Sequence, residues 1–190
     1  MITKEEFRTY IAITSLVFSF AILSGYIGAI NSPQQSRMIV DSFFGNLDFT
    51  KNFSPLLIFV FIFLNNVLKA LFVILFGFFF AIVPLVFIYT NGELIGLIVG
   101  VFQQENSLLT IVLGLLPHGI LEVPAIILAT SYGIWLGNCF YRRLRYKEPF
   151  RVHFSFALKK FFRVILPMLL AAAVIESFVT PMVINYLFSR

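Results

Sequence analysis

Apolar runs of about 20 residues recur along the whole chain, with short polar stretches between them. A helix needs about 20 apolar residues to cross the roughly 30 Å hydrocarbon core of a bilayer. The pattern predicts an all-α integral membrane protein with about five transmembrane helices. We place the spans at 9–30, 55–90, 93–115, 117–140 and 161–187, all within one membrane domain that covers 1–190.

The second of these runs is too long for one crossing. A single helix over 55–90 would be about 50 Å long, because each helical residue adds about 1.5 Å. We favour one long span with a kink or break near Asn65-Asn66, and expect a broken or re-entrant segment somewhere within 65–105. Asn91-Gly92 predicts a tight turn, and Pro117 predicts the first turn of the fourth helix.

Polar residues dominate the stretch 31–54, which follows the first span. We interpret the first span as a retained anchor and 31–54 as an extracytoplasmic loop. Within it, a short interfacial helix is predicted, because Met38, Ile39, Phe43 and Phe44 can face lipid from one side of a helix.

The net charge of +5 is concentrated in one segment. Of the 14 Lys and Arg residues, eight lie between 142 and 163. Cytoplasmic loops carry an excess of Lys and Arg, so a basic loop at 141–160 is predicted in the cytoplasm, together with the N-terminus four crossings earlier. The same charge favours membrane lipids over nucleic acid as partners. The predicted headgroup contacts are Arg142, Arg143, Arg145, Lys147, Lys159 and Lys160.

A few polar side chains interrupt the apolar runs. Each costs several kcal/mol in hydrocarbon unless it is paired or hydrated, so such residues are expected to meet inside the bundle. The predicted buried polar core consists of Asn65, Asn66, Lys69, Asn91, His118, Glu122, Glu176 and Thr180.

His118 and Glu122 are the residues of this core for which a chemical role is considered. Their i, i+4 spacing places both on one face of a helix. One reading is a hydrogen-bonded knot that locks two helices together, a second is a proton or ion pathway, and a third is a metal site with Glu176 as a further ligand. No cofactor is expected, and the His-Glu-x-x-His signature of metalloproteases is absent from the sequence.

Small residues recur at helical spacing in two places. Gly96 and Gly100 form one pair, and Ala129, Gly133 and Gly137 form a longer series. Such residues let helix backbones approach closely. We favour packing within one chain, with a seam between copies in a homo-oligomer as the alternative.

Four polar motifs follow one another along the chain, namely Asn65-Asn66, Asn91-Gly92, Pro117-His118-Gly119-x-x-Glu122 and Glu176-x-x-x-Thr180-Pro181. In this order they resemble the stage II sporulation protein M family, and the resemblance covers the chain from about residue 55 onward. It implies a non-enzymatic membrane scaffold that recruits partner proteins, which in spore-formers are cell-wall hydrolases. The rival reading is a transporter or permease subunit with an intramembrane ion path, and a third is a metal-dependent intramembrane enzyme.

Overall fold

The computed structural model describes residues 2–45, 53–104 and 108–182. For 108–110 and 112–118 it describes the backbone and not the side chains. The described chain is helical, and five of its helices are long and apolar enough to cross a membrane. This confirms the predicted fold class. The spans are Lys4–Asn31, Pro55–Phe78, Ile82–Phe102, Gly119–Tyr146 and Phe150–Met182.

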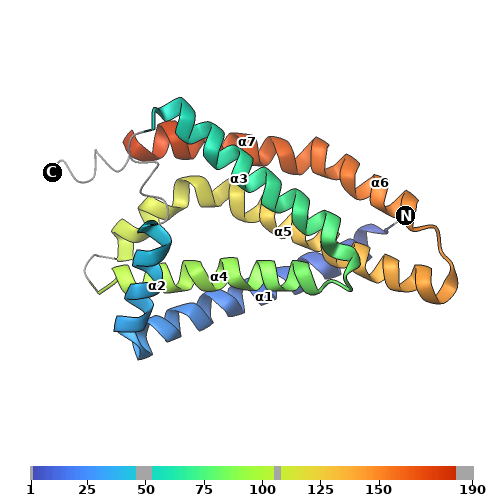
Figure 1. Ribbon diagram of the computed structural model, residues 1–190, viewed down its shortest axis with the longest axis horizontal. Coiled ribbons are helices and arrows are strands. Elements are labelled where there is room, and N and C mark those ends of the chain that lie inside the picture. Colours follow the sequence, from blue (N-terminus) through green and yellow to red (C-terminus); the bar gives the residue numbers. More distant parts are fainter. Residues whose placement is uncertain (1, 46–52, 105–107, 183–190) are drawn as a thin grey trace.

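The long helices run back and forth along the length of the molecule (Figure 1). The N-terminus lies at the same end as the connection between α5 and α6, which we call the basic end. The elements are α1 (Lys4–Asn31), α2 (Pro33–Gly45), α3 (Pro55–Leu75), η2 (Phe76–Phe78), α4 (Ile82–Phe102), α5 (Leu108–Tyr146), α6 (Phe150–Lys160), η3 (Phe161–Ile165), α7 (Leu166–Val174) and η4 (Ile175–Val179).

The region 55–90 is two helices and not one long span. The chain reverses at the basic end between α3 and α4, where Phe80 and Ala81 take positive φ values of 49° and 65°. The predicted break at Asn65-Asn66 is wrong, because both residues lie inside α3. The predicted turn at Asn91-Gly92 is also wrong, because both lie inside α4.

Helix α5 begins at Leu108, earlier than the predicted start at Pro117. Pro117 therefore lies within the helix, where a proline removes one backbone hydrogen bond and bends the axis. Figure 1 shows α5 bending in its N-terminal part. The helix continues to Tyr146, so the predicted basic loop at 141–160 is the end of α5, a short connection and α6.

Helix α2 is present where a short interfacial helix is predicted, and it occupies part of the region 31–54 that we interpret as a loop. Its place at the membrane boundary stays a prediction. Its buried residues are Ser36 and Val40, and Val40 packs with Ala29 of α1 and Val101 of α4. Its exposed large apolar residues are Met38, Ile39, Phe43 and Phe44. With about 3.6 residues per turn, Ile39, Phe43 and Phe44 flank the buried stripe, and Met38 lies nearly opposite it. A helix with exposed apolar residues suits the boundary between lipid and water.

Helices α1 and α4 pack backbone to backbone. A Cβ atom added at Gly96 would run into the Ile22 carbonyl of α1, and one added at Gly25 would run into the Glu93 carbonyl of α4. A Cβ at Gly100 would lie 2.5 Å from the Cβ of Ala29. The prediction that Gly96 and Gly100 serve packing within the chain is confirmed.

Helix α5 is the centre of the bundle, and it contacts α1, α3, α4, α6 and α7. Its second small-residue series also packs within the chain. A Cβ at Gly133 would lie 2.7 Å from the Val73 carbonyl of α3 and from Cγ of Pro84, and one at Gly137 would lie 2.5 Å from the Ala81 nitrogen. The sharp turn between α3 and α4 therefore sits directly on glycines of α5. A buried hydrogen bond, 3.1 Å long from Ser131 Oγ to Thr14 Oγ1, ties α5 to α1.

Candidate functional site

The predicted polar residues of α3 form a short patch at mid-length of that helix. Asn65 and Asn66 are half-buried, and the Asn65 Nδ2 donates to Asn66 Oδ1 over 3.4 Å. Lys69 is exposed. Because Lys69 is exposed, the α3 patch, meaning these three residues, reaches the surface of the protein.

Lys69 is the charged member of the α3 patch, and its ammonium group has no described partner. Within the part of the chain that the structure describes, no hydrogen bond or ion pair joins its ammonium group to another side chain. Phe78 ends the span nine residues later, so the Lys69 backbone lies roughly 13 Å from that end. Helical Cα–Cβ bonds tilt toward the helix N-terminus, which directs the lysine stem away from the nearer end.

Asn91 of α4 does not join the α3 patch through a hydrogen bond. Its Nδ2 donates to the Phe87 carbonyl one turn earlier, over 2.8 Å. Asn91 is thus satisfied within its own helix, which explains how an asparagine is held inside a span without a turn.

Glu122 is half-buried on α5, and it is not without an interaction partner. His118 belongs to the same helix, but its side chain lies outside the described residues. The knot, the pathway and the metal reading that involve this pair therefore all stay predictions.

Glu176 and Thr180 lie on or next to η4, a π-helical segment within the last span. Glu176 is half-buried, and Thr180 Oγ1 donates to the Ile175 carbonyl over 3.3 Å. Ser177 Oγ is buried and has no hydrogen-bond partner among the described residues. Single π-helical turns are rare and occur frequently at functional positions.

The fold brings α3, α5 and η4 together, and the predicted polar core itself stays a prediction. Both α3 and α5 contact η4, and the rings of Phe59 on α3 and Phe178 on η4 are 6.3 Å apart. Among the described side chains, no group of three His, Cys, Asp or Glu residues is placed to hold a metal ion. The candidate set of His118, Glu122 and Glu176 is not tested by this, because it includes His118.

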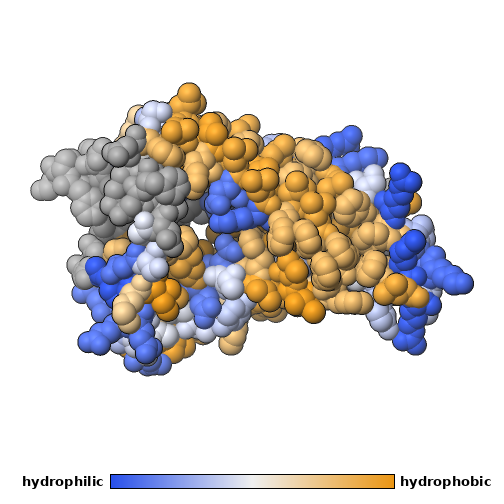
Figure 2. All heavy atoms as spheres, viewed as in Figure 1, coloured by the Kyte–Doolittle hydropathy of each residue, from blue (hydrophilic) through white to orange (hydrophobic). Residues whose placement is uncertain are grey.

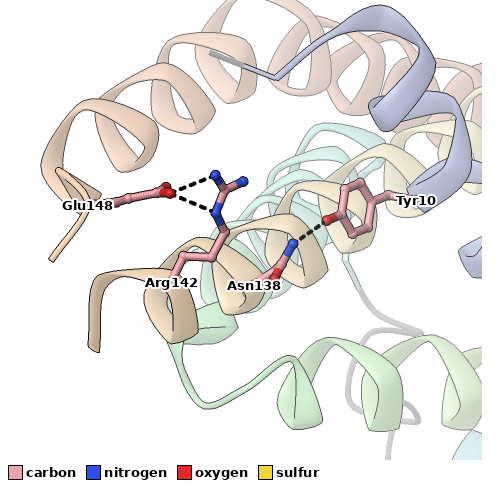
Figure 3. Close-up of polar contacts among 4 residues, drawn as sticks. All are labelled: Tyr10, Asn138, Arg142 and Glu148. Carbon is pink, nitrogen blue, oxygen red and sulfur yellow. Dashed lines mark hydrogen bonds and ion pairs between the residues drawn. The ribbon is translucent and has the colours of Figure 1, made fainter. Parts of the chain in front are cut away.

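The predicted headgroup residues gather at the basic end, where Figure 2 shows hydrophilic atoms. Arg142 donates to Glu148 Oε1 through Nε over 3.0 Å and through Nη2 over 2.6 Å (Figure 3). The Arg145 Nη1 donates to the Tyr141 hydroxyl, and the Lys160 ammonium lies 5.6 Å from the Phe156 ring centre. Arg143, Lys147 and Lys159 are exposed.

The start of α1 packs against this end of the bundle through contacts that no sequence motif indicates. Asn138 Nδ2 donates to the Tyr10 hydroxyl over 2.8 Å, next to the Arg142–Glu148 pair (Figure 3). The Phe7 ring stacks on Tyr132 at 4.4 Å between ring centres. Tyr10 and Asn138 carry no motif, so only the three-dimensional packing identifies their partnership.

Five long apolar helices, with α5 at their centre and charged groups gathered at one end, define a polytopic α-helical membrane protein. A family model described as "Stage II sporulation protein M" matches residues 14–181. The chain belongs to the stage II sporulation protein M family, which confirms the resemblance seen in its polar motifs.

The chain is also similar to a protein of Methanocaldococcus jannaschii that is described as uncharacterized. The two are 25% identical over 181 residues, which cover 93% of this chain and 97% of the relative. The similarity thus runs over nearly the full length of both proteins. No solved structure matches this chain.

Proposed function

We propose that this protein is a membrane-embedded scaffold that recruits partner proteins through the α3 patch. The exposed Lys69 carries this proposal. A lysine at the centre of a span costs about 2.5–3.5 kcal/mol on insertion scales, and intramembrane charges pair with one another when they can. No described side chain pairs with Lys69, and the proposal assigns this role to a carboxylate of a partner protein.

The surroundings of Lys69 suit a helix as the partner. Leu64, Leu68 and Phe72 are exposed on α3, and their i, i+4, i+8 spacing places them on one stripe next to Lys69. Helices in lipid associate through close packing with polar groups across the interface. The partner is therefore a protein with a transmembrane helix that carries Asp or Glu among apolar residues.

Cross-linked affinity purification from native membranes tests the scaffold. We expect the full chain to recover at least one other membrane protein, in amounts comparable to its own and well above a mock purification. Recovery of the chain alone, from membranes in which the cross-linker links other known complexes, would contradict the proposal.

The π-helical segment η4 favours a second candidate, a transporter subunit with an ion path. There, half-buried Glu176 lies beside the buried Ser177 hydroxyl, which has no partner among the described residues. Reconstitution in liposomes separates the two candidates. An ion path requires a pH-dependent flux that Glu176→Gln abolishes and Ser54→Ala, at the exposed cap of α3, leaves unchanged. The scaffold requires no such flux.

We further propose that the basic end faces the cytoplasm, as the excess of Lys and Arg there predicts. In a Cys139→Ser background, which removes the single cysteine, exposed positions at the two ends can be labelled separately. We expect a membrane-impermeant maleimide added to intact cells to label Gln34→Cys, and to label Arg143→Cys only after the cells are opened. The reverse pattern would invert the topology.

A further inference from the structure

A hollow of about 490 Å³ opens at the basic end, between the end of α3 and the start of α6. This volume lies within the range of roughly 300–1,000 Å³ found for small-molecule sites. Its lining is made of four phenylalanines, a leucine and one arginine, namely Phe76, Phe78, Phe150, Phe154, Leu75 and Arg151. None of the polar residues discussed above takes part in it.

Ring contacts hold the walls of the hollow in place. The Phe78 ring lies 5.8 Å from Phe140 of α5, and Phe140 lies 5.5 Å from Phe150 of α6. Phe150 in turn lies 5.9 Å from Phe154. This chain of rings links η2, α5 and α6, so the hollow exists before any ligand enters. Preformed walls reduce the entropic cost of binding.

The one charged side chain in the lining of the hollow is cationic. This is Arg151, which is exposed on the first turn of α6. The acid of this segment, Glu148, is already paired with Arg142. A guanidinium group binds phosphate through two parallel hydrogen bonds, so Arg151 can bind an anionic headgroup.

We propose that this hollow binds one anionic phospholipid, with its phosphate on Arg151 and an acyl chain among the phenylalanine rings. The occupant follows from the combination of an apolar lining and a cationic rim at the end of the transmembrane helices. A soluble anion would leave the rings uncovered, and a neutral lipid would leave the guanidinium without a partner. This site is separate from the α3 patch, and its test does not depend on the scaffold.

Lipid retention by the purified full chain tests this site. The protein is exchanged into nanodiscs of phosphatidylcholine with a minor fraction of phosphatidylglycerol, then extracted gently and analysed for bound lipid by native mass spectrometry. We expect one retained phosphatidylglycerol per chain. Arg151→Gln should lower its retention about tenfold, as expected for the loss of a charged hydrogen bond.

Two further variants separate a specific site from general attraction. Arg143→Gln removes an exposed charge from the same end without touching the hollow, and it should leave retention unchanged. Leu75→Trp fills the hollow without changing charge, and it should lower retention. Equal losses for Arg151→Gln and Arg143→Gln, or equal retention of phosphatidylcholine, would overturn the proposal. Unchanged helical content and melting temperature confirm that each variant is folded.

Discussion

Replacing Gly96 by alanine is expected to destabilise the protein by about 1–3 kcal/mol, the usual cost of inserting a methyl group into a packed interface. Gly96 is buried against the backbone of α1, where an added Cβ would meet the Ile22 carbonyl and lie 2.7 Å from the Tyr26 nitrogen. Backbone atoms cannot rotate away as a side chain can. The two helices would have to separate along their length, which would also disturb the contacts at Gly25 and Gly100.

Gly28→Ala is the matched control for this prediction. Gly28 also lies in a membrane-spanning helix, but beyond its own stretch of helix no described atom lies within 4 Å of the position of its missing Cβ. Alanine there should be neutral or stabilising by up to about 1 kcal/mol, because glycine is a poor helix former. Thermal unfolding of both variants in the same detergent measures the difference. Equal melting temperatures would show that α1 and α4 are not packed this closely.

Lys69→Met is expected to lower the recovery of the partner at least tenfold in cross-linked affinity purification. The charge pair within lipid is the feature that distinguishes the partner from surrounding acyl chains, and its loss removes on the order of 1.4 kcal/mol or more. Folding should not suffer, because methionine is a strong helix former and Lys69 is exposed. The variant should be at least as abundant in membranes as the wild type.

Lys159→Met is the matched control, because it removes a lysine that lies outside the α3 patch. It deletes one exposed lysine from α6 at the basic end, where headgroup contacts are each worth about 1 kcal/mol. Partner recovery should stay at the wild-type level. If both substitutions reduced recovery alike, the docking surface would not be the α3 patch.

The number of spans could be predicted because only a stretch of about 20 apolar residues can cross a bilayer. The turn between α3 and α4 could not be predicted from the sequence. It is built from Phe76, Gly77 and the apolar residues up to Ala81, without the Asn, Asp or Pro that mark turns in soluble proteins. Its glycine is there for contact with Gly133 of α5, which no local pattern reveals.

Asn91-Gly92 is the converse case, a turn signal without a turn. In lipid, a helix keeps every backbone group paired, so the cost of leaving the helix exceeds the local preference for a turn. The Asn91 amide is satisfied by the Phe87 carbonyl, and Gly92 packs against Phe18 and Ala21 of α1. The preference of Asn-Gly for turns holds in water-exposed loops, and it therefore does not predict a turn within a membrane span.

The sequence predicts a buried polar core but not how its members are arranged. Residues of α3, α5 and η4 were chosen because buried polar groups cost free energy, and those three elements do meet. The same reasoning cannot tell which polar residue faces inward. Lys69 is exposed and Asn91 bonds to its own helix, because helix rotation is set by apolar packing around α5.

Photo-cross-linking from α3 tests most directly whether the α3 patch is the docking surface. A photoreactive amino acid is placed at Leu68, which is 62% exposed beside Lys69, and at Leu16 of α1, which is 71% exposed, as the matched lipid-facing position. We predict an adduct with one membrane protein from position 68, lost with Lys69→Met, and only lipid adducts from position 16. Protein adducts of equal yield from both positions, or lipid adducts alone from position 68, would contradict the account.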